Sequence, residues 1–251
     1  MLNIVVPMAG RGQRFADAGY DLPKPLIPIH GFPMIQVVIE NLTPTRPHRF
    51  VFLLLREHAQ QFGLADRLRE WAPGCELVFV DQVTQGAACT VLLARSSIDD
   101  DRPLMIANCD QYVSVAIDDY LGQLSDATGL IMTMWADDPK WSFVRLGAGG
   151  AVTEVVEKQV VSNEATVGIY NFRHGADFVR AADAMIAQDL RVNGEFYVAP
   201  AYNQLLRAGA AVRVHNIGRV GAGMHGIGTP ADIEAFLAHP VSRQAVSRLR
   251  R

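Results

Sequence analysis

Short apolar runs and helical patterns alternate through the first half of the chain, and this alternation restricts the possible folds most. The apolar runs are Leu2–Met8, Phe50–Leu55, Glu76–Val80 and Pro103–Ala107, and the helical patterns are Met34–Leu42, Glu57–Trp71 and Ala87–Ala94. Strands separated by helices are typical of right-handed βαβ crossovers and a parallel sheet that helices cover on both faces. We therefore predict an α/β fold, a three-layer α/β/α sandwich with a mostly parallel, Rossmann-like mixed central sheet.

The second half has a different rhythm, with more strands and shorter turns. Strands are expected at Leu130–Trp135, Ser142–Leu146, Ala151–Val156, Thr166–Phe172 and Ala211–Asn216, and helices at Ala176–Gln188, Val198–Arg207 and near Pro230–Leu237. Because no Pro- or Ser-rich linker separates the halves, we expect one domain over residues 1–251, with halves 1–128 and 129–251. Ligands of open α/β sheets bind at the carboxyl ends of the strands, so the loops after Met8, Val80 and Ala107 are the candidate site.

Composition excludes several classes of protein. A formal net charge of −3 argues against binding of nucleic acid through overall charge. Three cysteines are too few and too scattered for a disulfide framework or a thiolate zinc site. The amino terminus lacks the basic region and cleavage site of a signal peptide, and no apolar run approaches the length of a membrane span. We therefore expect a cytoplasmic protein with no nucleic-acid or membrane partner.

Two segments near the amino terminus have the chemistry of a phosphate site. Gly10 and Gly12 let the backbone approach a ligand closely, and Arg11 and Arg14 add donors suited to phosphate oxygens. Lys24 stands between two prolines that restrict its backbone, which would hold its charge in one place. Taken separately, each segment is equally consistent with a plain turn or a solvated surface loop.

Together these segments closely resemble the amino-terminal signature of the sugar-1-phosphate nucleotidyltransferase (nucleotide-sugar pyrophosphorylase) family, in its short single-domain type. The resemblance extends from Pro7 to Leu42, PMAGRGQRFADAGYDLPKPLIPIHGFPMIQVVIENL. It comprises a Gly-rich loop with Arg, then Pro-Lys-Pro-Leu, then Gly-x-Pro-Met at the start of a helix. These motifs occur in the family's order and spacing, so they are specific for the family but much less so for the substrate.

The resemblance implies a nucleotide-binding half over residues 1–128. The triphosphate would be held by the Gly-rich loop, at Met8, Ala9, Gly10, Arg11 and Gly12. Arg14 and Lys24 would be catalytic, with Lys24 stabilising the charge that develops as pyrophosphate leaves. The segment Asp81–Ala88 resembles the base-reading element, so Gln82 or Gln85 would contact the base and Gly86 would let it lie against the backbone. Val83 stands where the family usually has Pro, which leaves open which Gln reads the base.

The resemblance also implies a metal ligand and an acceptor-binding half over residues 129–251. Asp110 of Asn108-Cys109-Asp110 would bind Mg²⁺, which proteins hold through one or two carboxylates plus substrate phosphates. The acceptor would be contacted by Asn108, Trp141, Glu157, Lys158, Gly168, Glu195 and Tyr197. Within this set Lys158 would contact the acceptor's phosphate and Glu157 a hydroxyl or amine. Phe143 and Tyr170 fall in the same region and could equally be buried core aromatics.

One element departs from the family pattern near the carboxyl end. Gly226 of Gly226-Ile-Gly-Thr-Pro230 occupies the position where many members have a second metal-binding Asp. Asp232 is close in sequence but is expected in the first turn of the next helix, where a carboxylate suits the helix dipole. Mg²⁺ would then rely on Asp110, phosphates and water, or on another acid such as Glu195; altered activity is the third reading.

These residues together predict a Mg²⁺-dependent nucleotidyltransferase that joins a nucleoside triphosphate to a small phosphorylated acceptor and releases pyrophosphate. A sugar 1-phosphate is the default acceptor, which would place the enzyme in nucleotide-sugar and polysaccharide biosynthesis. A cytidylyltransferase for a non-sugar phosphate, such as phosphocholine or a phosphorylated amino acid, is the alternative. A nucleotide-sugar-dependent glycosyltransferase is disfavoured because the Asp-x-Asp motif is absent at Asp110. A catalytically silent nucleotide sensor is disfavoured because it needs no transition-state cation. A homo-oligomer remains open.

Overall fold

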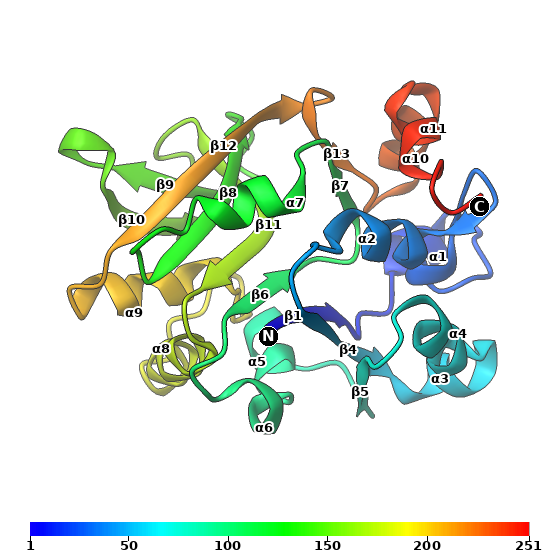
Figure 1. Cartoon of the computed structure of the whole chain (residues 1–251), viewed down its shortest axis with the longest axis horizontal. Coiled ribbons are helices and arrows are strands. Elements are labelled where there is room, and N and C mark those ends of the chain that lie inside the picture. Colours follow the sequence, from blue (N-terminus) through cyan, green and yellow to red (C-terminus); the bar gives the residue numbers. More distant parts are fainter. Residues whose placement is uncertain (251) are drawn as a thin grey trace.

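The computed structural model describes residues 1–250 and is built around one eleven-stranded sheet (Figure 1). The strand order is β5-β4-β1-β6-β11-β8-β12-β13-β7, with β9 and β10 joined to it through β11. The sheet contains β1 (Leu2–Met8), β4 (His48–Leu55), β5 (Glu76–Val80), β6 (Leu104–Ala107), β7 (Gln111–Val113), β8 (Gly129–Trp135), β9 (Ser142–Leu146), β10 (Val152–Glu157), β11 (Glu164–Phe172), β12 (Val212–Val220) and β13 (Gly223–Gly226). A separate short ribbon pairs β2 (Pro28–Ile29) with β3 (Phe32–Pro33).

The sheet is mixed and mostly parallel. Strands β5, β4, β1 and β6 pair in parallel, β11 runs against β6 and β8, and β12 returns parallel to β8. The parallel block carries the continuous apolar runs of the first half, as expected for strands covered on both faces. The predicted fold class is confirmed.

Helices cover both faces of the sheet. They are α1 (Gln13–Asp17), α2 (Met34–Leu42), α3 (Arg56–Phe62), α4 (Leu64–Trp71), α5 (Ala87–Leu92), α6 (Arg95–Ile98), α7 (Ile117–Gly122), α8 (Gly175–Ala187), α9 (Tyr202–Arg207), α10 (Pro230–Ala238) and α11 (Val241–Ala245), with 3-10 turns at Lys24–Leu26, Ala148–Gly150 and Ala199–Ala201. Helices α2, α4, α7 and α10 contribute to one hydrophobic cluster, whereas α5, α6, α8 and α9 contribute to another.

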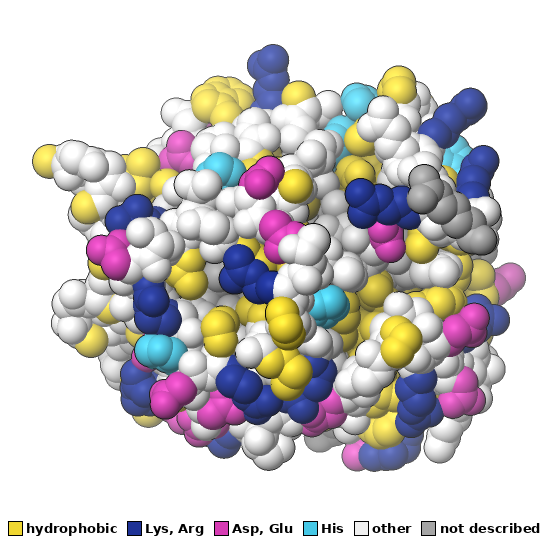
Figure 2. Space-filling view, in the orientation of Figure 1, with side chains coloured by type: hydrophobic (Ala, Val, Ile, Leu, Met, Phe, Trp, Pro, Cys, Tyr) yellow, Lys and Arg dark blue, Asp and Glu magenta, His cyan; other side chains and the backbone are white. Residues whose placement is uncertain are grey.

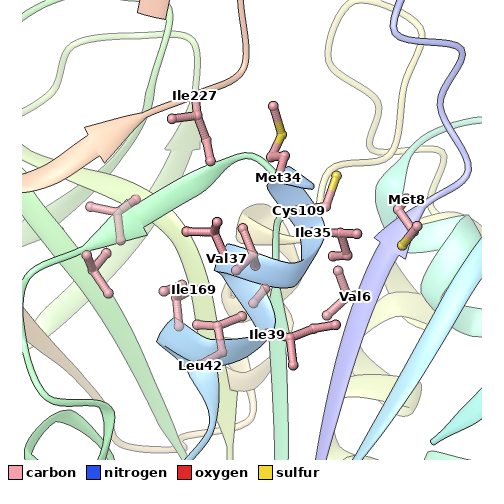
Figure 3. Packing of buried hydrophobic residues seen from close by; sticks show 14 of the residues in the cluster. Val6, Met8, Met34, Ile35, Val37, Ile39, Leu42, Cys109, Ile169 and Ile227 are labelled. Atoms are coloured by element: carbon pink, nitrogen blue, oxygen red, sulfur yellow. The ribbon is translucent and has the colours of Figure 1, made fainter. Parts of the chain in front are cut away.

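Strand β1 shows why two cores form. Ile4 and Val6 belong to the first cluster, whereas the intervening Val5 belongs to the second, because successive side chains of a strand point to opposite faces. Figure 3 shows Val6 beside Ile35 and Ile39 of α2, with Cys109 in the same cluster. The central strands are thus packed against hydrophobic side chains on both faces, so the loops that follow their carboxyl ends start from well-fixed positions.

Most elements lie where the sequence predicts, within one to three residues at most ends. The helix expected over Glu57–Trp71 is two helices, because Gly63 adopts a left-handed φ of 61° between α3 and α4. The helix expected over Val198–Arg207 begins as a 3-10 turn before α9, and the strand expected over Ala211–Asn216 continues to Val220. Strands β7 and β13 were not predicted; they are short, and each is stabilised by its pairing with the other, which local pattern does not reveal.

The surface carries charges of both signs. Figure 2 shows Lys and Arg side chains interspersed with Asp and Glu over the visible face, in keeping with the formal net charge of −3. Within residues 1–250, no helix combines the length and the apolar character needed to cross a membrane.

Candidate functional site

A cavity of about 520 Å³ collects eight of the predicted site residues. Its walls come from α1, the segment after β6, the start of β9, the end of β10, the middle of β11, and the segment between β13 and α10. The predicted residues in its lining are Arg14, Asn108, Asp110, Trp141, Glu157, Lys158, Gly168 and Tyr197. Arg14 and Tyr197, which are 183 positions apart in sequence, therefore face one space. The segments after β1 and β6 reach it from the carboxyl ends of parallel strands, as expected for an open α/β sheet.

The other predicted residues do not line this cavity. They are Met8, Ala9, Gly10, Arg11, Gly12, Lys24, Gln82, Gln85, Gly86 and Glu195. The side chains of Met8 and Ala9 are buried in the two cores, so only their backbone could meet a ligand. Gln82, Gln85 and Glu195 are exposed, and Arg11 pairs at 3.1 Å with Glu57 on the surface.

Lys24 and Asp110 form an ion pair at one end of the cavity. Lys24 Nζ lies 2.5 Å from Asp110 Oδ2, and both side chains are about four-fifths buried (20% and 22% exposed). Burial lowers the pKa of Lys24, and the positive charge of Arg14 lowers it further. The charge and hydrogen bond of Asp110, together with Cys109, raise this pKa by more, so it lies above its ordinary value. Lys24 is therefore a permanent cation held beside the cavity.

The Gly-rich loop places Lys24 by direct packing. Gly12 has a φ of 65°, and a Cβ at this position would lie 3.1 Å from Lys24 Cβ. A side chain here would be strained and crowded, so glycine satisfies both conformation and space. The close approach joins the two segments of the sequence signature into one structural unit, with Arg14 on the next helical turn lining the cavity.

The segment before α5 is attached to the opposite half of the molecule. Gly86 has a φ of 127°, and a Cβ there would lie 2.5 Å from the carbonyl oxygen of Phe196. The amide of Phe196 donates to the Gln85 carbonyl and that of Ala88 donates to the Phe196 carbonyl. The close approach at Gly86 is made by the protein's own backbone, and contact of a base with Gly86, Gln82 or Gln85 stays a prediction.

Two lysines lie beside two aromatic side chains at the other end of the cavity. Lys158 Nζ donates to the Tyr197 hydroxyl at 2.7 Å and lies 4.9 Å from the centre of that ring. This contact raises the pKa of Lys158. Lys140 Nζ lies 5.2 Å from the centre of the Trp141 ring. Both aromatic side chains therefore already have a cationic partner.

A buried polar wall lines the cavity at the same end as Lys158. Ser142 Oγ donates to Glu157 Oε2, and the hydroxyls of Thr166 and Tyr170 are 2.9 Å apart. All four side chains line the cavity although their residues are less than a tenth exposed. Burial raises the pKa of Glu157, which the Ser142 hydrogen bond and the Lys158 charge oppose.

Gly168 is the position in this wall where the backbone of β11 packs closely against Asn108 and Gln111. It has a φ of 82°, and a Cβ there would lie 2.2 Å from Asn108 Nδ2 and 2.9 Å from Gln111 Oε1. The Gly168 carbonyl accepts hydrogen bonds from the backbone N–H of Asn108 and from Gln111 Nε2. The register of β11 against β8 shifts between Thr166 and Tyr170, around this glycine. Gly168 therefore holds the segment after β6 against β11.

The departure at position 226 has a structural counterpart. A Cβ on Gly226 would lie 3.6 Å from Asp232 Cγ, and a Cβ on Gly228 would lie 2.6 Å from Asp110 Oδ2. Asp232 sits in the first turn of α10 as expected, accepting from Thr229 Oγ1 at 2.7 Å, and it also lines the cavity. Within residues 1–250, no three His, Cys, Asp or Glu side chains gather into a metal site. A cation here would need ligands from a substrate or from water.

Several lining residues were missed by sequence reasoning. They are Gln111, Lys140, Ser142 (which lies between Trp141 and Phe143), Thr166 and Thr229, and Asp232 was expected only as a helix residue. Tyr170, left open between pocket and core, is both buried and part of the cavity wall. A polar residue inside an apolar strand is the one signal that could have revealed Thr166.

A family model described as nucleotidyl transferase matches residues 4–194. The bifunctional protein GlmU of Ralstonia nicotianae is 30% identical over 180 residues, which cover 69% of this chain and 37% of that protein. GlmU of Ralstonia pickettii is 27% identical over 222 residues, covering 84% of this chain and 46% of that protein. The chain thus spans between about a third and a half of the length of these curated relatives.

Solved structures share the fold over nearly the whole chain. The nucleoside-diphosphate-sugar pyrophosphorylase from Vibrio cholerae RC9 matches with a TM-score of 0.79 at 24% identity, covering 93% of this chain and 99% of that one. The inositol-1-phosphate CTP transferase from T. maritima matches with a TM-score of 0.74 at 14% identity, covering 98% and 96%. At these identities the likeness concerns the fold, whereas the family match rests on sequence over most of the chain. The chain belongs to the nucleotidyl transferase family.

Proposed function

We propose that this protein is a Mg²⁺-dependent nucleotidyltransferase that couples a nucleoside triphosphate to a sugar 1-phosphate and releases pyrophosphate. One observation carries the proposal: a single cavity joins the Lys24–Asp110 pair and Arg14 at one end to Glu157 and Lys158 at the other. Membership of the nucleotidyl transferase family supports it. Residues 1–128 would form the nucleotide half and 129–251 the acceptor half of one domain, acting in the cytoplasm in nucleotide-sugar and polysaccharide biosynthesis.

The chemistry requires positioning and charge rather than a protein nucleophile. A phosphate oxygen of the acceptor attacks the α-phosphorus of the triphosphate, the bond to the β-phosphate breaks, and pyrophosphate leaves. Arg14 and Lys24 would neutralise the charge that develops on the departing phosphates, with backbone amides of residues 8–12 around the triphosphate. Lys158 would hold the attacking phosphate from the opposite end of the cavity.

The oxygen donors around Asp110 fit Mg²⁺, a hard cation that prefers carboxylates, phosphates and water. Asp110 would hold it, and Asp232, which lies where a side chain at position 226 would point, is the second carboxylate at this end. When bound, the ion neutralises phosphate charge. Glu195 is exposed and outside the cavity lining, so we propose it for the acceptor side rather than for the metal.

The two lysine–aromatic contacts favour a sugar phosphate over phosphocholine. Aromatic faces recognise a quaternary ammonium when they are free to pack against it. Here Lys140 lies near the Trp141 ring and Lys158 is bound to the Tyr197 hydroxyl, and the charges of both lysines would repel a cationic head group. An anionic, hydroxyl-bearing acceptor suits this end of the cavity better.

A pyrophosphate-release screen tests the proposal. The intact protein is incubated with Mg²⁺ and each common nucleoside triphosphate, against hexose 1-phosphates, hexosamine 1-phosphates, phosphocholine and a phosphorylated amino acid. We expect release that requires both substrates, is abolished by a chelator, and is fastest with a sugar 1-phosphate. Selective turnover of phosphocholine would replace the proposed acceptor, and no release with any pair would reject the activity.

A further inference from the structure

Residues 196–203, here called the connecting segment, are bonded at one end to the segment before α5. The N–H of Phe196 donates to the Gln85 carbonyl at 2.9 Å, and the Phe196 carbonyl accepts from the N–H of Ala88 at 3.0 Å. Because a Cβ on Gly86 would lie 2.5 Å from the Phe196 carbonyl oxygen, the two backbones are in direct contact. The connecting segment therefore holds the residues that are expected to contact the base.

The connecting segment also holds strand β10, at two points. The Tyr197 hydroxyl accepts from Lys158 Nζ at 2.7 Å. Asn203, in the first turn of α9, donates from Nδ2 to the Val155 carbonyl and accepts from the Val155 N–H through Oδ1, both at 2.8 Å. Since β10 pairs with β9 alone, this amide takes the place of a second neighbouring strand. Both contacts therefore act on the end of β10 that leads to the cavity.

The connecting segment is built to move as one body. Its 3-10 turn leads directly into α9, and the residues at the junction have right-handed helical backbone angles. Five of its residues are at most 5% exposed and belong to the second hydrophobic cluster: Phe196, Val198, Ala199, Ala201 and Tyr202. Closely packed side chains transmit a displacement instead of absorbing it. A shift of residues 85–88 should therefore be felt at Val155 and Lys158.

We propose that Tyr197 and Asn203 are positioning residues that hold Lys158 and the end of β10, and that the connecting segment couples acceptor binding to nucleotide binding. This inference rests on the proposed function, in which Lys158 holds the acceptor phosphate and the segment before α5 contacts the base. A nucleotide that fixes residues 85–88 also fixes the connecting segment bonded to them. Ordering Lys158 then costs the acceptor less free energy, so each substrate strengthens binding of the other.

Asn41 offers a matched control, because it makes the same two-way contact with an edge strand elsewhere in the sheet. Asn41 Nδ2 donates to the Val113 carbonyl at 2.8 Å, and Oδ1 accepts from the Val113 N–H at 2.9 Å. Val113 lies in β7, the last strand of the sheet order, and Asn41 is outside the lining of the cavity. Removing either amide takes the same pair of hydrogen bonds from an edge strand, so stability should fall comparably. Only Asn203 should affect the coupling.

The experiment measures acceptor binding to the intact protein by calorimetry with Mg²⁺, with and without a triphosphate analogue that has a methylene group between the α- and β-phosphorus. The acceptor is the sugar 1-phosphate used fastest in the pyrophosphate screen, and the analogue carries the base preferred there. In the unaltered protein we expect the analogue to strengthen acceptor binding by about tenfold. Asn203→Ala and Tyr197→Phe should each reduce this factor to about threefold or less. Asn203→Asp, which still accepts from the Val155 N–H, should give an intermediate factor, and Asn41→Ala should leave the factor unchanged.

Three results would overturn the inference and leave the proposed function standing. They are an analogue without effect on acceptor affinity in the unaltered protein, a factor unchanged in both Asn203→Ala and Tyr197→Phe, and an equal loss of the factor in Asn41→Ala. Denaturant unfolding shows which variants are folded, and Tyr197→Phe, which removes one hydroxyl, decides the matter if Asn203→Ala does not fold. Absence of pyrophosphate release with every pair of substrates would reject the proposed function and this inference with it.

Discussion

The two ends of the cavity are built in opposite ways. At the phosphate end, Arg11 and Arg14 are exposed, and the Lys24–Asp110 pair is the partly buried element, at 20% and 22% exposure. At the acceptor end, four polar residues are buried in two hydrogen-bonded pairs, Ser142 with Glu157 and Thr166 with Tyr170. Phosphate charge can be met by exposed cations and backbone amides, whereas a neutral hydroxyl must be met by a fixed partner.

The difference teaches where each kind of specificity resides. In the proposed function, the phosphate end would accept the triphosphate of any nucleotide, because its groups would recognise charge that all nucleotides share. The acceptor end would distinguish ligands by the geometry of a few buried groups, each costly to leave unpaired. Substitutions at the two ends should therefore fail differently, in turnover at one and in selectivity at the other.

Lys24→Ala should have the largest effect. Removing a buried cation beside the reacting phosphates should lower kcat by about 10²–10³-fold, while triphosphate affinity changes far less, because the charge matters most in the transition state. Single-turnover kinetics and a separate binding titration measure the two quantities. Equal losses in binding and turnover would show that Lys24 acts only in ground-state binding.

Asp110→Asn should raise the Mg²⁺ concentration needed for half-maximal activity by at least about tenfold. The Asp110 carboxylate pairs with Lys24 and is also proposed to hold the cation, so removing its charge affects both the ion pair and the metal. A titration of activity with Mg²⁺ measures the shift, and Asp232→Asn run in parallel tests the second carboxylate. A titration curve unchanged by Asp110→Asn would place the metal elsewhere.

Gly168→Ala and Gly10→Ala form a matched pair across the two ends. At Gly168 the positive φ and the clash with Asn108 should lower the free energy of unfolding by about 2–4 kcal/mol and raise the acceptor KM. At Gly10 a Cβ would meet nothing within 4 Å, so stability should change by less than about 0.5 kcal/mol, with any loss confined to the triphosphate KM. Denaturant unfolding and steady-state kinetics of both variants decide whether the ends are separable in this way.

As pH falls, acceptor binding should weaken at a higher pH than expected for an ordinary glutamate. Burial raises the pKa of Glu157, so as pH falls this carboxylate takes up a proton above the ordinary value of about 4.3 and can no longer accept from the ligand. The same shift means that the folded state binds this proton more tightly, so its stabilising contribution is largest at low pH and is lost as pH rises through the raised pKa.

The pH profile of kcat/KM for the acceptor measures this effect, with the profile for the triphosphate as internal reference. Glu157→Gln, which cannot ionise, should remove the acid limb belonging to Glu157 and leave the others. An acid limb that persists unchanged in Glu157→Gln would assign it to another group.

Local sequence accounts for much of the fold and for the phosphate end. The apolar runs of β1, β4, β5 and β6 and the helical period of α2 were readable because each is a contiguous pattern. Lys24 and Asp110 were singled out separately, one for its flanking prolines and one for its place after a strand, and the structure brings them to 2.5 Å. The break at Gly63 and the reason for glycine at position 86 could not be read in this way, since both depend on backbone conformation.

By itself, the sequence determined the alternation of elements, the class of fold, the family signature and the cations of the phosphate loop, because all of these are carried by neighbouring residues. Only the tertiary structure decided that Thr166, Tyr170, Ser142 and Glu157 line one wall of the cavity, since they lie on three strands whose pairing and register place them together. It also decided that Asp232 shares a cavity with Asp110, more than a hundred positions earlier in the chain. Hydrogen bonds between distant strands depend on register, and register is a property of the assembled sheet.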